Sequence, residues 1–452
     1  MSLSALFDIG KSALISSQAA LSVTANNVAN VNTPGYSRQD VKLGSMAPQL
    51  VGGEWIGRGV NIVAIERNYN AFIDTQINNE TSSQGMYDSK SSVLSQVEDI
   101  FNETQYGLSG AMQDFFNAWN EVAANPEERA QRVTLLESSG ALASRFQSMN
   151  TRLLDLQQNI NREIPVVVND VNKIIKSIYD LNLQVTVTGG ASDTLDQRDQ
   201  MINRLAEYVS LNKFEDSIGR VTVIVEGKNL IEPNTYNTIS AQAGTDGMYD
   251  VVMSDTGETL NLQNSSGGII KGMLDLRDVE LQNYRDNLDT LAYNLAVEVN
   301  TVHSGGYALD ETTGRNFFTP PTTVTGAAGS LTVAISDPNL VAASSSPNEL
   351  PGNNLQAQAI SDLQSQALVS GSTFSDYYRS LVSQVGIDTA SASRELGSSQ
   401  SVLFQLKGKR DEFAGVSLDE EAVNIVRFQR SYEAAAKIIK VTEDLFNTII
   451  NM

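Results

Sequence analysis

Apolar side chains recur every seven residues at both ends of the chain. The stripe near the start consists of Phe7, Leu14, Leu21 and Val28, and the stripe near the end consists of Leu418, Ile425, Tyr432, Ile439 and Phe446, with Phe428 beside it. A sustained seven-residue repeat keeps one side of a helix turned towards a partner along a shallow left-handed supercoil. The pattern predicts a long helix at each end of the chain, and we expect the two to pair as an antiparallel coiled coil.

The first of these helices ends in an unusual run of carboxamides. Asn26, Asn27 and Asn30 continue the helical pattern, although asparagine is a poor helix former because its side chain competes for backbone hydrogen bonds. The helix then stops at Thr33-Pro34-Gly35-Tyr36, which fits a type II turn with glycine supplying the positive φ. We expect this turn to lead the chain out of the helix.

The second terminal helix has a clear start. Ser417 and Glu420 have the spacing of a capping box, in which Ser417 is the N-cap and Glu420 reaches back from the third helical position. Acidic residues here also suit the positive end of the helix dipole.

The middle of the chain alternates helical and β-like segments. Asn125 and Pro126 predict the start of a helix with a seven-residue repeat from Phe146 to Leu181, a kink or break at Pro165, and an end at Gly189-Gly190. Further helices are expected at about 194–209, 269–303 and 355–413, the last broken near Gly371 and Gly386. Alternation predicts a strand at 220–226, with Val221, Val223 and Val225 on one face, a strand pair around a turn at 255–257, and a strand at 331–336 (LTVAIS).

These elements predict a mainly α fold with an inserted β-rich domain. We expect a terminal coiled-coil domain (1–45 and 412–452), a helical bundle (46–210, 268–305 and 352–411) and a small outer β-rich domain (211–267 and 306–351). Such nesting would place the chain ends at one pole and the middle of the sequence at the other.

Composition excludes several classes of function. The net charge of −22 argues against nucleic acid or an anionic membrane as the partner of the body of the protein. The sequence contains no cysteine, so disulfides and thiolate metal sites are excluded. The uncharged stretch between Lys11 and Arg38 is too polar for a membrane span, and no cleavable signal peptide is recognisable.

The candidate chemistry is sparse, and we expect no enzyme, cofactor or metal site. His303 is the only histidine, no nucleophile elbow surrounds it, and we interpret it as a helix-end or interface residue. Asp193, Asp196 and Asp199, with Arg198 and Arg204 nearby, are interpreted as a solvated, salt-bridged helix face. Trp55 and Trp119 are expected in the core.

The stretch NNVANVNTPGYSRQDV from Asn26 resembles the N-terminal motif of bacterial flagellar rod, hook and hook-associated proteins. It looks most like the hook-associated protein 1 family, and the C-terminal segment GVSLDEEAVNIVRFQRSYEAAAKIIKVTEDLFNTII is similar to that family's last helix. The regions from Leu195 (LDQRDQMINRLAEY) and Val299 resemble interior landmarks of the family, although the β-rich part is brief beside that of larger members.

The resemblance implies a structural subunit of the junction between hook and filament. Such subunits are exported without a cleaved signal peptide through the flagellar type III apparatus, with an export chaperone as a partner, and assemble outside the cell into a ring. The ring would contact hook protein on one side and a second hook-associated protein, or the filament, on the other, with no nucleic acid partner and no membrane insertion. The assembly interface would comprise both apolar stripes together with Asn26, Asn27, Asn30, Pro34, Gly35, Tyr36 and Arg38. We hypothesise that the asparagines bond neighbouring subunits in several registers, with Tyr36 and Arg38 anchoring the exit from the helix.

Three alternatives remain open from the sequence. A rod or hook subunit would share the asparagine-rich motif, but we expect such a chain to be richer in β structure. A surface adhesin would use exposed aromatics in the β region, where Tyr236 and Tyr249 are the few on offer. An enzyme, such as a wall hydrolase, would need a carboxylate pair in a cleft, and no pattern isolates one.

Overall fold

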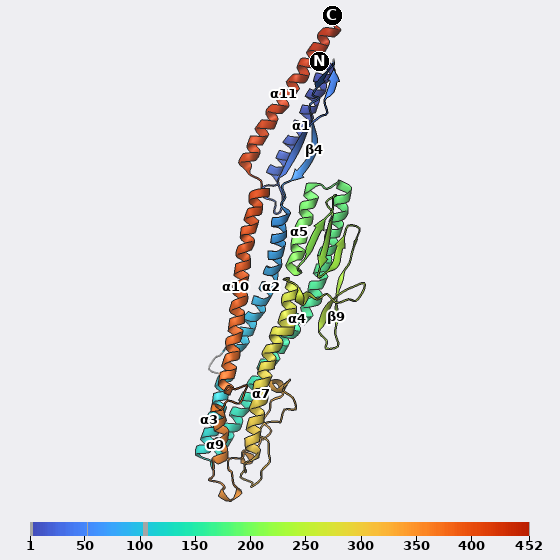
Figure 1. The fold of residues 1–452 in the computed structure, drawn as a ribbon. Coiled ribbons are helices and arrows are strands. Elements are labelled where there is room, and N and C mark those ends of the chain that lie inside the picture. The colour runs from blue at the N-terminus through green and yellow to red at the C-terminus, as the bar shows by residue number, and fades with distance from the viewer. Residues whose placement is uncertain (1–2, 52, 103–106, 452) are drawn as a thin grey trace.

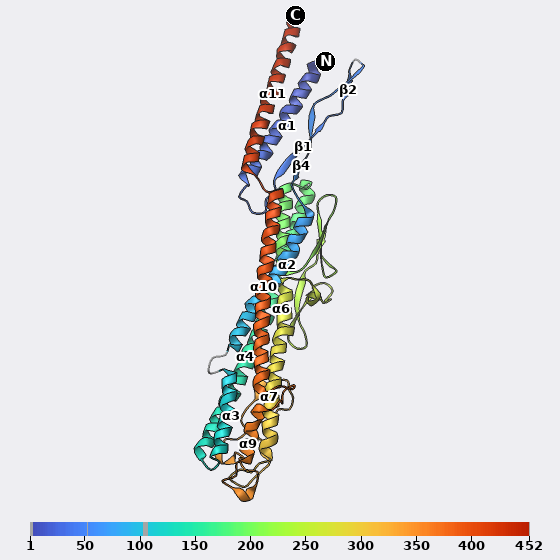
Figure 2. The same ribbon diagram turned by 60° about the vertical axis from the view of Figure 1, so that its left-hand side comes forward.

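The molecule is elongated, and both ends of its chain lie at one pole (Figures 1 and 2). The structure is a computed structural model that describes residues 3–51, 53–102 and 107–451. Helix α1 (Leu3–Ala29) runs from this pole towards the body, and α11 (Leu418–Ile450) returns beside it in the opposite direction. The predicted antiparallel pairing of the terminal helices and the mainly α fold are confirmed.

Small side chains are among the most deeply buried residues of the terminal helices. Gly10, Ser17 and Ala20 of α1 are buried, as are Ala435 and Thr442 of α11. A Cβ atom added to Gly10 would lie 2.9 Å from Cγ1 of Ile439 and 3.6 Å from the backbone oxygen of Ala435, so the two helices approach closely here. The predicted stripe of larger residues on α1 is only partly buried, and Phe7 remains 45% exposed.

A β-hairpin that the sequence patterns did not predict follows α1. Strand β1 (Gln39–Ser45) pairs with β4 (Val60–Arg67) through a bulge between Lys42 and Leu43, and β2 (Gln49–Val51) pairs with β3 (Glu54–Ile56) at the tip. The hairpin packs on α1 on the side away from α11 (Figure 2). Trp55 at the tip is 70% exposed, so its predicted place in the core is wrong: the tip has no helix to pack against.

Long helices form the body of the molecule. α2 (Ala71–Phe101) packs along α10 (Phe374–Ala414), and α4 packs against both α3 and α5. Trp119 is fully buried in the common core, as predicted. The remaining helices are α3 (Leu108–Ala124), α4 (Arg129–Thr188), α5 (Ser192–Tyr208), α6 (Ile269–Asp275), a π-helical segment (Leu276–Glu280), α7 (Leu281–Ser304), α8 (Ala327–Ser330) and α9 (Leu355–Asp362), with 3₁₀ turns at Leu262–Asn264, Pro338–Leu340, Pro347–Glu349 and Leu363–Ser365.

Three predicted helix limits are wrong. Asn125 does not start α4 but caps the end of α3, and the turn after it is held by Arg132, which donates to the carbonyl of Pro126. α4 continues through Pro165, and α10 continues through Gly386. Both helices bury one side along their whole length, and that packing offsets the local cost of a proline or glycine. The predicted end at Gly189 is confirmed, since this residue caps α4 with a φ of 65°.

The β-rich part is fastened to α4 by asparagines. β5 (Asn212–Glu215), β6 (Val221–Val225), β7 (Lys228–Glu232) and β8 (Thr235–Tyr236) form one antiparallel sheet, and β9 (Ile239–Ala243) pairs with β10 (Tyr249–Met253). The three valines of β6 are buried on one face, as predicted. Asn182 of α4 donates to the carbonyl of Val221 at 2.8 Å and accepts the N–H of the same residue at 3.0 Å. Asn172 pairs with Ile239 in the same way.

The segment at 306–351 lies elsewhere, at the pole remote from the chain ends (Figure 1). Gln147 donates to the carbonyl of Leu331, and Arg132 to that of Val341, so this segment contacts the first half of α4. The sheets contact the second half, and the two segments grouped above in one outer domain therefore lie at different heights along α4. LTVAIS forms a single bridge between Phe318 and Val333 instead of the predicted strand.

Candidate assembly site at the joint between the terminal helices and the bundle

The turn at 33–36 forms as its sequence predicts. The N–H of Tyr36 donates to the carbonyl of Thr33 at 3.2 Å, and Gly35 has a φ of 78°. Gln200 of α5 donates to the carbonyl of Pro34 at 2.8 Å. The positive φ favours glycine here, and a Cβ atom on Gly35 would also displace the Gln200 side chain, which would lie 2.3 Å away.

The asparagines before the turn bind their own chain. Asn27 is 1% exposed, and its carboxamide donates to the carbonyl of Gln39 at 3.0 Å and accepts the N–H of Gln39 at 3.0 Å. Its oxygen also accepts the Tyr36 hydroxyl at 2.9 Å, and Asn30 donates to Asn26 at 3.0 Å. Burial, and then the nearby aspartates, raise the pKa of Tyr36 above its usual value, so the hydroxyl stays a donor. The carboxamide of Asn27 is therefore occupied within the subunit, joining the end of α1 to the start of β1.

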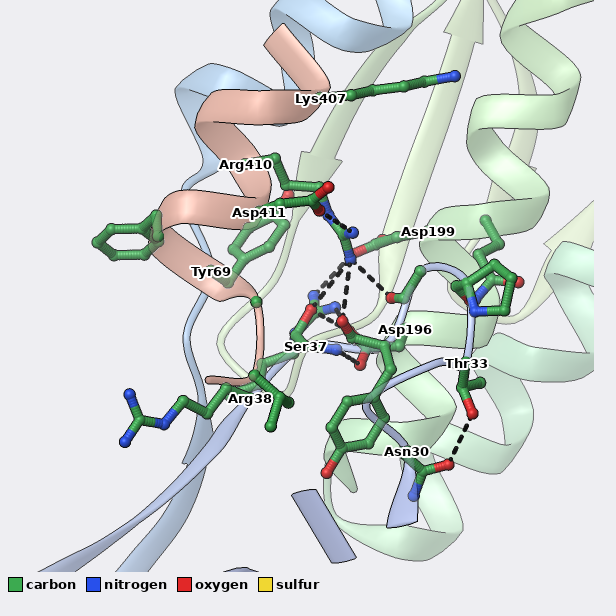
Figure 3. Close-up of a pocket in the computed structure, with 18 of the residues that line it drawn as sticks. Asn30, Thr33, Ser37, Arg38, Tyr69, Asp196, Asp199, Lys407, Arg410 and Asp411 are labelled. Atoms are coloured by element: carbon green, nitrogen blue, oxygen red, sulfur yellow. Dashed lines mark hydrogen bonds and ion pairs between the residues drawn. The ribbon is translucent and has the colours of Figure 1, made fainter. Parts of the chain in front are cut away.

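Asp196 on α5 receives the chain after the turn. Its carboxylate accepts the N–H of Ser37 at 2.7 Å and the Ser37 hydroxyl at 2.9 Å (Figure 3). Arg67, at the end of β4, bridges Asp196 and Asp199 at 2.7 Å each. Burial alone would lower the pKa of Arg67, but the two carboxylates raise it, so the cation is retained. Burial also raises the pKa of Asp196, although Arg67 and Ser37 oppose the shift.

The prediction of a solvated face on α5 is therefore wrong for Asp196 and Arg198, which are 5% and 1% exposed, and for Asp199, whose side chain is 10% exposed, although the predicted salt bridging is present. The partner that the sequence analysis missed is Arg67, which is distant in sequence but carried to the site by the hairpin. Asp193, one turn earlier, is exposed as expected and accepts the side-chain amide of Gln39 at 2.6 Å.

A second set of contacts holds the start of α11. Arg38 forms ion pairs with Glu420 and with Glu421, whose Oε1 lies 2.7 Å from its Nε, and its N–H donates to the carbonyl of Ala414 at 2.8 Å. Ser417 is the N-cap of α11, as predicted, but its side chain makes no capping hydrogen bond. Glu420 faces Arg38 across the joint, which is why the reciprocal bond of a capping box is absent.

All the segments that connect the terminal layer to the body meet at this joint. We define the terminal layer as α1, the hairpin at 39–67 and α11. The joint surrounds a cavity of about 1010 Å³ lined by residues of 30–38, 67–77, 196–207 and 407–420 (Figure 3). Arg410 of α10 closes one side by donating to the carbonyl of Gly35 at 2.7 Å. The arrangement can fix the direction of the terminal layer relative to the bundle.

The chemistry of the remaining candidate residues is structural. His303 is fully buried at the end of α7, where Nδ1 donates to the carbonyl of Arg315 at 2.8 Å and Nε2 accepts the N–H of Ala342 at 2.9 Å. Burial lowers its pKa to about 4, so it is neutral at pH 7. Within the described ranges, no group of histidine and acidic side chains is placed to hold a metal ion. None of the helices described is both long and apolar enough to span a bilayer.

The predicted interface residues of the terminal helices are divided between seam and surface. Leu14, Leu21, Val28, Ile425, Phe428 and Ile439 are half-buried, whereas Phe7, Leu418, Tyr432 and Phe446 are exposed. A further exposed apolar stripe on α11 was not predicted; it comprises Val423, Val426, Val441 and Leu445.

Three known protein families match parts of the chain. The family described as flagellar hook-associated protein FlgK helical domain matches residues 94–318. The flagella basal body rod protein family matches residues 7–36, and the flagellar basal body rod FlgEFG protein C-terminal family matches residues 408–452. The two rod-family matches thus fall on the paired terminal helices.

Individual relatives agree with these matches. Flagellar hook-associated protein 1 of Bacillus subtilis is 29% identical and aligns over 98% of this chain and 97% of its own length. The Escherichia coli protein of the same name is 26% identical over the whole of both chains, in an alignment of 547 positions, so it contains segments with no counterpart among these 452 residues. The solved structure of the flagellar hook junction protein FlgK from Burkholderia pseudomallei shares the fold, with a TM-score of 0.69 at 13% identity, covering 75% of this chain and 99% of that one.

Proposed function

The chain belongs to the family of flagellar hook-associated proteins, which are structural components of the bacterial flagellum and not enzymes, and we propose that it forms the junction between hook and filament. The observation that carries this proposal is the terminal layer: two paired helices with apolar side chains left uncovered, fixed to a rigid body by the joint at Asp196 and Arg38. A subunit built in this way suits an assembly in which neighbouring copies cover those side chains.

We extend the proposal to the details of assembly that the family resemblance implies. Copies form a ring through residues 1–45 and 412–452, which we propose as the assembly domain together with the hairpin. The ring lies outside the cell, with hook protein on one side and a second hook-associated protein or the filament on the other. The subunit reaches this place by type III export without a cleaved signal peptide, accompanied by an export chaperone.

Among the predicted interface residues, those exposed on α11 have the most direct structural support. Tyr432 is 37% exposed and Phe446 is 55% exposed, although both continue the apolar seven-residue repeat. An apolar side chain left in water at such positions is stabilised when a neighbouring subunit covers it. Asn27 has no such role, because its carboxamide is already occupied.

Deletion of the gene followed by electron microscopy tests the proposal. Hooks without filaments, with flagellin released to the medium, are the expected result. Loss of the hook itself would point to a rod or hook subunit, and normal filaments would refute the proposal.

Complementation of the deletion tests the surface. The combination of Tyr432→Asp and Phe446→Asp is expected to restore no filaments. The matched control is Val187→Asp, because Val187 is 87% exposed but lies at the end of α4, outside the terminal layer. Filaments with the control and none with the double variant, at equal subunit levels, would locate the interface on α11.

A further inference from the structure

Two apolar surfaces of the terminal layer are left exposed by the part of the chain that the structure describes. The first is the outer stripe of α11, defined by Val423, Val426, Val441 and Leu445, which are between 47% and 68% exposed. The second is the hairpin face, defined by Leu50, Trp55, Val63 and Ile65, which are between 46% and 70% exposed. Leu50 and Trp55 are directly opposite each other on β2 and β3, so they form one continuous apolar tip.

One copy of the chain cannot cover these surfaces with each other. α1 lies between the hairpin and α11 in both views, and it is α1 that the hairpin strands contact (Figures 1 and 2). The hairpin base is also fixed on α1: the N–H of Val60 donates to the Ser12 hydroxyl at 3.3 Å, and a Cβ atom on Gly59 would lie 2.3 Å from that hydroxyl. The hairpin therefore cannot swing round to the far side of its own layer without losing this base.

We propose that the hairpin face of one copy packs on the outer stripe of α11 in the next copy. The inference deepens the proposed function, on which it rests, by naming the two surfaces that meet. Because the two surfaces differ and lie on opposite sides of the layer, the contact is heterologous and repeats from copy to copy. Repetition of such a contact generates a ring when the rotation closes and a helix when it does not.

The distribution of charge supports a second copy as the occupant. The whole chain has a net charge of −22, so two bodies repel each other. The hairpin at 39–67 carries three acidic residues (Asp40, Glu54 and Glu66) and three basic residues (Lys42, Arg58 and Arg67), and α1 carries only Asp8 and Lys11. α11 carries six acidic and four basic residues, and two of the acids, Glu420 and Glu421, are paired with Arg38 of the same chain. The terminal layer is thus the region where copies approach with the least repulsion.

The absence of cysteine from the sequence allows a direct test by disulfide cross-linking in flagella. Val63→Cys is combined in one variant with Val426→Cys and in another with Val441→Cys, and assembled flagella are oxidised. A ladder of covalent oligomers is expected from at least one of these variants, because each copy presents one cysteine to each neighbour. Val63→Cys with Val187→Cys is the matched control and is expected to give no ladder.

Normal filaments without a ladder from either pair would overturn the inference while leaving the junction role intact. A second variant covers the case in which the cysteine variants fail to assemble. Val63→Asp combined with Ile65→Asp is expected to abolish filaments. The purified variant is expected to keep its helical circular dichroism spectrum and its thermal unfolding midpoint. Normal filaments with this charged hairpin would equally overturn it. If the proposed junction role were wrong, cells in which the gene is deleted would still form filaments.

Discussion

Replacing Asp196 by alanine should release the terminal layer from the body without unfolding the body. Asp196 accepts two hydrogen bonds from Ser37 and one charge-assisted bond from Arg67, and it is itself only 5% exposed. The common hydrophobic core extends from Leu94 to Ala392 and includes no residue of the terminal layer. The joint can therefore open while the bundle stays folded.

The size of the effect follows from what the alanine leaves behind. Removing one partner of a buried ion pair costs about 3–5 kcal/mol, because the remaining charge is left without its counterion. Arg67 keeps Asp199 at 2.7 Å, so the lower end of this range applies, about 3 kcal/mol. A change of 1.36 kcal/mol is tenfold in an equilibrium constant, so opening of the joint becomes roughly 100-fold more frequent.

Hydrogen exchange of backbone amides measures this opening. The amides of Arg38 and Asn68 donate to Ala414 and Arg38 respectively, and both are expected to lose roughly 100-fold in protection. Asp193→Ala is the control on the same helix: its carboxylate is exposed, so an effect within about threefold is expected. Unchanged protection of both amides in folded Asp196→Ala would show that the joint does not depend on this carboxylate, and the reasoning would be refuted.

Three further results are expected. His303 has a pKa of about 4 in the folded protein against an ordinary value of 6.5, so its contribution to stability is complete above pH 6.5 and is lost as the pH falls towards 4. Denaturant unfolding should show that the free energy of unfolding decreases by about 3 kcal/mol between these pH values. This decrease should be missing from His303→Gln. Asn182→Leu leaves the buried N–H and carbonyl of Val221 unpaired and should lower the free energy of unfolding by about 2–4 kcal/mol, whereas Gln184→Leu at an exposed position should leave it within about 0.5 kcal/mol; equal melting curves for the two would contradict this account. Gly10→Val should separate the terminal helices and abolish motility in soft agar, while Gln18→Val on the exposed side of α1 should not.

The sequence predicts the long elements well because their periodicity is local. The two terminal helices, the end of α4 at Gly189 and the turn at Gly35 all follow from side-chain spacing or from the φ that a glycine permits. At Pro165 a kink or a break was predicted, and α4 is not broken there; the break predicted at Gly386 is also absent, because tertiary packing outweighs a local preference.

The hairpin and the joint escaped prediction for a different reason. Val60, Ile62 and Ala64 do alternate, which is a signal for a strand, but the helical pattern on either side was stronger. The partnership of Arg67 with Asp196 joins residues 129 positions apart, and no spacing rule reports such a contact. The residues that decide how the terminal layer is attached are thus visible only in three dimensions.

The packing between α1 and α11 has a consequence for the stage of assembly at which the terminal layer becomes stable. Small residues such as Gly10, Ser17 and Ala435 are buried and contribute little free energy on burial. The larger apolar residues Leu14, Leu21 and Ile439 are only half-buried, and Phe7 and Phe446 are exposed. In a free monomer the two terminal helices are therefore paired weakly. Most of the free energy from burying their apolar side chains is gained only when the subunit joins the assembly. The terminal layer of such a subunit becomes fully stable only at the site of assembly, and free subunits in dilute solution polymerise less readily.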